Sequence, residues 1–331
     1  MAYQLVTAAD QDDLLDKFVD FAIANAGFSN KATGIVASGW SDGRSYVKLT
    51  KGLFTWIFAK TRATEDNPDF NFYVQMSFDS AINTTNSDID ETPDGPLAVS
   101  CWNFDGPFGK VYMYTDGLSV HCAVELSVGI YTHFSIGSIT KTETFTGGEF
   151  LAGFAGRDVT ATPNHSRASP MFPGGALSIS PLVTQHNPQT EGSFSTYFGS
   201  KIHAVPLSGA STQYSRFAQF GRAANNNQAA GEAVHGITNS LTLTDGSSAV
   251  RANSQTQRTP LWPNIIRLHN QTNDLWRISG HIPITRFCFM DYLNPGDIIF
   301  DEWQVFPYCQ KNGDATICVN SGNLGIAYRR V

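Results

Sequence analysis

The chain has 331 residues, of which 41% are hydrophobic, 12% aromatic and only 15% charged, and its formal net charge is −7. A sizeable core is therefore possible, while the charged fraction lies below the roughly 25% of an average globular chain. The sequence carries no basic stripe typical of nucleic-acid-binding proteins, because "KTRA" at 60–63 and the terminal "YRRV" are short and isolated. We therefore expect no nucleic-acid partner.

The first residues read "MAYQLVTAADQDD" and lack a basic region, an apolar stretch and a cleavage site, so they predict no secretory signal. No stretch reaches the roughly 18 consecutive apolar residues that a membrane-spanning helix needs. We therefore expect a protein that is made in the cytoplasm and has no membrane span.

Residues 8–26 carry the one strong helical pattern. Thr7 and Asp10 have the spacing of a capping box, in which a hydroxyl cap is followed three residues later by a carboxylate. Leu14 and Phe18 then recur at helical spacing, and Gly27 is a natural helix end. The pattern predicts a helix from about residue 8 to residue 26.

The pattern then changes to that of β-strands. Lys51-Gly52 separates two strand-like runs, and residues 70–78 are rich in aromatic and β-branched side chains. Asp116-Gly117 is a strong hairpin signal. It is followed by strict alternation of apolar and polar residues over 118–127, which predicts a strand with one buried and one solvent-exposed face.

Strand-like runs continue at 130–136 and resume after residue 261, where Asn294-Pro295-Gly296-Asp297 fits a type II turn. Together the runs predict a mainly β fold, with antiparallel β-sandwich or jelly-roll-like sheets, one N-terminal helix and long irregular loops.

The predicted organisation has three parts. We expect residues 1–155 to form the helix and an antiparallel sheet, and residues 261–331 to form a C-terminal β segment that packs on this sheet. Residues 156–260 are rich in Gly, Ser and Asn and weak in periodicity, which is typical of an irregular arm or insertion. A compact domain rarely carries so much irregular chain alone, so we expect neighbouring subunits to order this arm.

The glycine-rich stretch "TFTGGEFLAGFAG" at 144–156 invites a phosphate-binding interpretation. Gly148-x4-Gly153 is followed by Phe154 instead of the lysine of a P-loop, and the GxGxxG spacing of dinucleotide-binding proteins does not occur. We expect Gly147 and Gly148 to turn the chain, and Gly153 and Gly156 to form a hinge where the sheet gives way to the irregular arm.

Two polar patterns could indicate chemistry. Ser135 in "HFSIG" resembles a nucleophile elbow, but the preceding glycine is missing and the residue falls within a strand pattern. His121 and His133 form the one histidine pair that suggests a metal, because a three-residue turn at 127–129 would place both on one sheet face and a two-residue turn would separate them. With no third ligand evident, we expect hydrogen-bonded or exposed histidines. The sequence predicts no catalytic residue, cofactor or metal site, and therefore no enzyme.

An acidic loop and the cysteines complete the candidate sites. Asp88, Asp90 and Asp94-Gly95 lack the order of a calcium loop and predict an acidic surface. The five cysteines, Cys101, Cys122, Cys288, Cys309 and Cys318, include no CxxC pair and indicate neither a disulfide framework nor a zinc site. Cys309 and Cys318 face each other if a hairpin turn centres on Gly313-Asp314 and are out of register if it centres on Asn312-Gly313, so a bridge between them stays open.

The tryptophans allow two interpretations. Six are present, at Trp40, Trp56, Trp102, Trp262, Trp276 and Trp303. Most are expected in a sandwich core, while some could serve as interface anchors or as platforms on which sugars stack. The second interpretation is the basis of an alternative function, a carbohydrate-binding or host-attachment β domain.

Three segments resemble a family of structural virion proteins of tailed bacteriophages. They are "GIYTHFSIGSITKTETFTGGEFLAGF" at 129–154, "WRISGHIPITRFCFMDYLNPGDIIFDEWQVFP" at 276–307 and "SGNLGIAYRRV" at 321–331. The order and spacing of the three segments carry the resemblance, which covers about a fifth of the chain.

The resemblance implies a structural role in the tail, neck or baseplate of a virion. It implies a homo-oligomer arranged in a symmetric ring that contacts other virion proteins, and no catalytic residue. Such proteins are synthesised in the host cytoplasm and end up in the particle without a signal peptide, which agrees with the expectations from the residues themselves.

Overall fold

The computed structural model describes residues 1–32, 46–52, 54–60, 72–78, 98–102, 106–142, 150–156, 201–203, 217–219, 232–236, 255–270, 275–307, 310–311 and 324–330. These residues confirm the mainly β, antiparallel, sandwich-like fold with one helix. Most of the predicted arm at 156–260, the acidic loop with Asp88, Asp90 and Asp94, and the pair Cys309 and Cys318 lie outside the described residues.

The strands form three sheets. The first runs in the order β1 (Ala2–Ala8), β7 (Phe108–Thr115), β8 (Ser119–Ser127), β9 (Ile130–Ser138), β11 (Phe150–Gly156), β12 (Lys201–His203) and β13 (Phe217–Gln219). The second runs β14 (Glu232–Gly236), β15 (Trp262–Asn270), β16 (Leu275–Phe289), β19 (Leu324–Arg329), β18 (Trp303–Pro307) and β17 (Ile298–Ile299), and β10 (Thr140–Lys141) pairs with β16. The third runs β2 (Ser29–Ala32), β3 (Tyr46–Lys51), β4 (Phe54–Lys60), β5 (Phe72–Phe78) and β6 (Ala98–Trp102).

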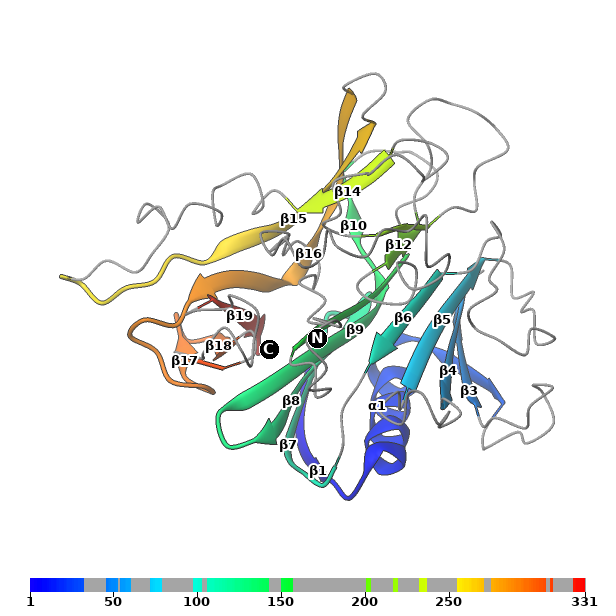
Figure 1. The fold of residues 1–331 in the computed structure, drawn as a ribbon, viewed down its shortest axis with the longest axis horizontal. Helices are drawn as coiled ribbons and strands as arrows, with labels where there is room; N and C mark the ends of the chain where they lie inside the picture. Colours follow the sequence, from blue (N-terminus) through cyan, green and yellow to red (C-terminus); the bar gives the residue numbers. More distant parts are fainter. Residues whose placement is uncertain are drawn as a thin grey trace, which may run out of the picture.

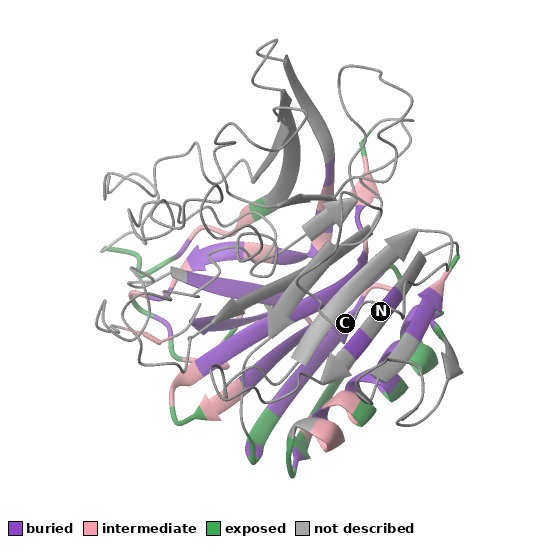
Figure 2. Ribbon diagram, turned by 45° about the vertical axis from the view of Figure 1, so that its right-hand side comes forward, coloured by how far each residue is buried: buried purple, intermediate pink, exposed green. Residues whose placement is uncertain are grey.

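The first sheet lies between the other elements. Helix α1 (Gln11–Ala26) and the third sheet cover one of its faces, and strands β16, β18 and β19 cover the other (Figure 1). Figure 2 shows the buried residues running along its central strands. Because both faces are covered, side chains of both alternating sets along β7, β8 and β9 lie inside the protein.

The two faces differ in chemistry because the strands alternate. On β7, Val111 and Met113 face the helix, in a cluster with Leu14, Phe18 and Trp56. Phe18 meets the ring of Phe134 from β9 at 4.9 Å and the ring of Phe58 from β4 at 6.0 Å, both edge to face. This side is an apolar core of the kind that the sequence composition allows.

The prediction of one solvent-exposed face for residues 118–127 is wrong. Three of the residues that should face solvent, Ser119, His121 and Ala123, are completely buried, whereas the apolar Leu118 is 40% exposed. Glu125 is half-buried, and Ser127, at the end of the strand, is exposed. Strands β16, β18 and β19 of the second sheet cover the three buried residues, and these strands come from the C-terminal part of the chain. Alternation therefore separated the two faces correctly but could not show that both are covered.

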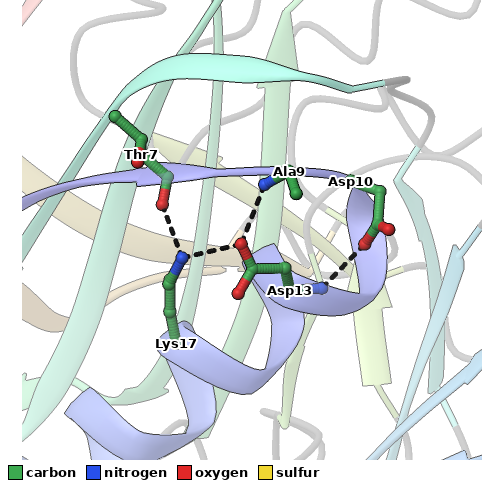
Figure 3. A network of polar contacts seen from close by, with 5 residues as sticks. All are labelled: Thr7, Ala9, Asp10, Asp13 and Lys17. Atoms are coloured by element: carbon green, nitrogen blue, oxygen red, sulfur yellow. Dashed lines mark hydrogen bonds and ion pairs between the residues drawn. The ribbon is translucent and has the colours of Figure 1, made fainter.

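Helix α1 begins later than expected. Its N-cap is Asp10, whose Oδ1 accepts a hydrogen bond of 2.9 Å from the backbone N–H of Asp13. Asp13 Oδ2 in turn accepts bonds from the Ala9 N–H at 2.8 Å and from Lys17 Nζ at 2.6 Å (Figure 3). Thr7 does not cap the helix because it lies in β1, where its carbonyl oxygen accepts a bond from Lys17 Nζ. The predicted capping box is thus shifted by three residues.

Other local predictions are confirmed. The helix ends at Gly27, whose φ of +68° is the left-handed conformation that glycine adopts readily. Asp116-Gly117 connects β7 to β8, with Asp116 Oδ1 accepting bonds from the N–H groups of Leu118 and Ser119. The segment Asn294–Asp297 forms the predicted turn, with Gly296 at φ +88° and a bond of 3.0 Å from the Asp297 N–H to the Asn294 carbonyl.

The glycine-rich stretch contributes a strand instead of a hinge. Residues Phe150–Gly156 form β11, which pairs with β9 in continuous register from Phe150 opposite Ser138 to Gly156 opposite Thr132. Gly153 and Gly156 are therefore ladder positions, while Gly147 and Gly148 lie outside the described residues.

Strand β1, the edge strand that pairs with β7, was not predicted from the sequence.

Within the described ranges, no helix is both long and apolar enough to cross a membrane.

Gly280 is expected to tolerate no side chain. A Cβ at this position in β16 would collide with the carbonyl oxygen of Thr140 in β10, whereas a Cβ at Gly109 in β7 would meet nothing within 4 Å. Gly280→Ala should lower the free energy of unfolding by about 1–3 kcal/mol through overpacking. Gly109→Ala, the matched control, should change it by less than about 0.5 kcal/mol, as is usual at an unconstrained surface site. Urea unfolding measures both, and equal effects of the two substitutions would contradict the predicted close approach of β10 to β16.

Candidate functional site

The polar side chains that could act as acids, bases or hydrogen-bond partners gather between the first and second sheets. Tyr112 and Tyr114 of β7 and Tyr131 of β9 form a buried cluster with Phe306 of β18 and Tyr328 of β19. The histidines and serines that the sequence singled out lie on the same face of the first sheet, because His121 is paired with Ser135 and Ala123 with His133 across β8 and β9. We call this group of side chains the inter-sheet cluster.

His133 joins the two sheets directly. Its Nε2 lies 2.9 Å from the carbonyl oxygen of Pro307, and its Nδ1 lies 2.8 Å from the hydroxyl of Tyr328. A carbonyl oxygen can only accept, so Nε2 carries the proton, and in the neutral ring Nδ1 then accepts from the Tyr328 hydroxyl. Complete burial lowers the pKa of His133 to about 4, which keeps the ring neutral at physiological pH.

Two stacked tyrosines form the centre of the cluster. The rings of Tyr114 and Tyr328 lie 4.8 Å apart and within 9° of parallel. The Tyr114 hydroxyl donates a bond of 2.7 Å to Oε1 of Gln304, and Nε2 of Gln304 donates one of 3.2 Å to the carbonyl oxygen of Gly296. Burial raises the pKa of Tyr114 well above its usual value, so the hydroxyl stays protonated and can serve as this donor.

The second histidine, His121, is hydrogen-bonded to a residue of its own strand. His121 Nε2 lies 2.8 Å from the hydroxyl of Ser119, whose backbone N–H is bonded to Asp116 Oδ1. Burial lowers the pKa of His121 to about 4, and the nearby carboxylate of Asp116 opposes this shift only in part. Ser135, directly opposite, is completely buried in β9, and its hydroxyl has no hydrogen-bond partner within the described part of the chain.

His121 and His133 do lie on the same face of the first sheet. The turn between β8 and β9 has two residues, Val128 and Gly129, which alone would separate His121 from His133. A bulge between Glu125 and Ser127 shifts the register by one residue and restores the common face. Among the described residues, no three His, Cys, Asp or Glu side chains are placed to hold a metal ion.

The hydrogen bonds of the inter-sheet cluster connect the first and second sheets. Tyr114 and His133 are buried, and each bonds a group of the second sheet: the Tyr114 hydroxyl bonds Gln304, and the His133 ring bonds the Pro307 carbonyl and the Tyr328 hydroxyl. Buried polar groups of this kind stabilise only when their bonds are made, so each partner fixes the position of the next.

Of the remaining candidates, Trp40 and the side chains of Cys101, Trp102 and Trp276 lie outside the described part of the structure, and the others take ordinary structural positions. Trp56 is completely buried beside Phe28, and Trp303 is buried under the guanidinium of Arg286, 4.8 Å from the ring. Trp262 is partly buried against the inter-sheet cluster. Cys122 and Cys288 are buried free thiols. Tyr114, Gln304, Pro307 and Tyr328 were not predicted individually from the sequence. The last three lie within the segments that resemble virion proteins, but no local pattern marks them as partners of the histidines.

Removing the Tyr328 hydroxyl should destabilise the protein. Tyr328→Phe leaves the buried Nδ1 of His133 without this donor, so the free energy of unfolding should fall by about 1–3 kcal/mol. Tyr292→Phe removes a hydroxyl from a tyrosine that is 44% exposed and should cost less than about 0.5 kcal/mol. Urea denaturation compares the two, and a loss as small for Tyr328→Phe as for the control would contradict the role of this bond.

Acid should weaken the inter-sheet cluster before most carboxylates titrate. Between pH 6.5 and about 4 the unfolded chain protonates the histidines at positions 121 and 133, while the folded protein keeps them neutral. Stability is therefore full above the ordinary histidine pKa of 6.5 and falls as the pH decreases toward 4. His133→Gln, which retains a donor for Pro307 but does not titrate, should make the dependence of Tm on pH shallower in this window. A slope as steep as in the parent would show that His133 does not cause the loss.

No protein-family model matches the chain, and no curated protein sequence matches it. The role of the inter-sheet cluster is therefore inferred from its own geometry.

Proposed function

We propose that the protein is a structural component of a tailed-phage virion, located in the tail, neck or baseplate. In this role it assembles with copies of itself in a symmetric ring and binds neighbouring virion proteins. It is made in the host cytoplasm and acts in the particle, through its surfaces and not through catalysis.

One observation carries the proposal. The three segments that resemble phage virion proteins meet at the inter-sheet cluster: His133 of the first segment bonds to Pro307 of the second and to Tyr328 of the third. Segments that lie far apart in the sequence thus form one packing unit. A resemblance spread over three separate stretches is what a shared packing unit would leave in a sequence.

The hydrogen bonds of the buried polar side chains support the same role. His121, His133 and Tyr114 hold hydrogen bonds in the protein interior, where they add cohesion. A virion component has to withstand mechanical load, and a sheet covered on both faces with hydrogen bonds between its layers suits that requirement. Symmetric assemblies of repeated chains are the usual form of such components.

The alternative function, a carbohydrate-binding or host-attachment domain, requires exposed aromatic rings beside a pair of carboxylates. Among the tryptophans whose burial is described, Trp56 and Trp303 are packing residues that cannot stack on a sugar, whereas Tyr292 is exposed. Host attachment is therefore one of the outcomes that the following experiment distinguishes.

The proposal predicts the place of the chain in a purified particle. Mass spectrometry of purified phage should find the chain in multiple copies per particle, and a cryo-electron-microscopy map should place it in a symmetric ring of the tail, neck or baseplate. Absence of the chain from purified particles would overturn the proposal. A peripheral location with an open aromatic groove, together with binding to host glycans, would favour host attachment instead.

A further inference from the structure

Ser135 is a completely buried polar residue in the middle of the first sheet. Its side chain does not reach bulk solvent, and its Oγ has no hydrogen-bond partner within the described part of the chain. A hydroxyl that leaves water and finds no new partner destabilises the folded state. Buried hydroxyls in native proteins are therefore in most cases bonded, either to the protein or to an ordered water molecule.

The neighbours of Ser135 on its own face of the sheet offer few partners. Directly across the sheet, Ser135 is paired with His121 in β8 and with Gly153 in β11. Along β9, the next residues on the same face are His133 and Gly137, because side chains alternate with a period of two. Two of these four neighbours are glycines, so only the two imidazole side chains could bond the hydroxyl from within the sheet.

Both imidazoles bond other groups. The nitrogens of His133 lie 2.8 Å from the Tyr328 hydroxyl and 2.9 Å from the Pro307 carbonyl oxygen. Nε2 of His121 lies 2.8 Å from the Ser119 hydroxyl. Turning the His133 ring toward the hydroxyl in β9 would break its bonds to the second sheet.

The chemistry of this position selects a small neutral molecule as the partner. Burial lowers the pKa of His121 and of His133 to about 4, so both flanking rings are neutral and provide no charge that would compensate a buried ion. Because Gly153 has no side chain, the sheet itself does not fill the place beside the hydroxyl. A hydroxyl both donates and accepts, and water is the smallest neutral molecule that does the same. The polar ring of His121 on the other side gives the site the polarity that a buried water molecule requires.

We propose that an internal water molecule is bound to Ser135 beside Gly153 and is a constituent of the inter-sheet cluster. The water molecule completes the hydrogen bonding of the buried polar face of the first sheet. The inference concerns the interior of the chain and does not depend on the proposed function.

Magnetic relaxation dispersion of the water signal tests this site in the purified full chain. The method counts water molecules that stay inside a protein for longer than the protein takes to tumble. Ser135→Ala should reduce this count by about one, because the water molecule loses the hydroxyl that holds it. Ser127→Ala, which removes an exposed hydroxyl at the end of β8, is the matched control and should leave the count unchanged. An unchanged count in Ser135→Ala would overturn the inference.

The direction of the change in Tm is a second readout. Removing a hydroxyl that is bonded to water loses this bond, whereas removing an unbonded hydroxyl relieves the cost of its burial. We therefore expect Ser135→Ala to lower Tm by about 2–4 °C relative to Ser127→Ala, which corrects for the general effect of this exchange in a strand. A Tm equal to that of the control, or higher, would show that no water molecule is bonded to the hydroxyl.

A density map of the unmodified chain covers the case in which Ser135→Ala does not fold. Crystallography or cryo-electron microscopy at a resolution of about 2 Å should show a peak about 2.5–3.0 Å from Ser135 Oγ, which is the distance of a hydrogen bond between oxygens. A map that resolves water molecules elsewhere in the protein but has no peak at this place would also contradict the proposal.

Discussion

Burial of the first sheet on both faces is the constraint on which the rest of the structure depends. In the central parts of β7, β8 and β9, side chains that point away from the helix are buried and have to be accommodated under the second sheet, whereas Lys110, near the start of β7, reaches water. On the helix side this requires only apolar packing. On the other side the strands carry histidine, serine and tyrosine, and these groups need hydrogen-bond partners in a medium of low dielectric constant. The partners come from β18 and β19, near the other end of the chain.

His133 shows how this requirement organises the fold. Its ring is neutral because charging it in the interior would cost much more than in water, and a neutral ring has one donor and one acceptor. Those two atoms meet a backbone carbonyl of β18 and the hydroxyl of Tyr328 in β19, so one side chain fixes two neighbouring strands relative to the first sheet. The stacked rings of Tyr114 and Tyr328 set the spacing of the two layers at the same place.

The inter-sheet cluster also connects the interior with the surface. Gln304 accepts a bond from Tyr114 on the inside and donates one to the Gly296 carbonyl at the base of the turn Asn294–Asp297. This turn is therefore fixed to the inter-sheet cluster. Groups that are held in place before a partner binds lose little conformational entropy on binding, which suits the proposed structural role.

Local structure was predictable from the sequence where a short-range interaction determines it. The left-handed helix end at Gly27, the Asp116-Gly117 hairpin and the turn at Asn294–Asp297 depend on the conformational preferences of a few neighbouring residues, and each was predicted in place. Alternation over residues 118–127 likewise identified the strand and assigned its side chains to two faces. The helix start was wrong by three residues because Thr7 and Asp10 are both good caps, and pairing of β1 with β7 takes Thr7 into the sheet.

Only the tertiary structure decided what covers each face and which distant residues meet. Sequence periodicity reports the direction of a side chain but not the layer that it enters, so His121 and His133 read as exposed or hydrogen-bonded residues without identifiable partners. Their environment depends on β18 and β19, and the common face of the two histidines depends on a bulge that leaves no sequence signal. The sequence by itself thus determined the strands, the turns and the chemical character of each face. Long-range packing determined that the polar face is interior, because a hydrogen bond between residues 195 positions apart exists only after the sheets have come together.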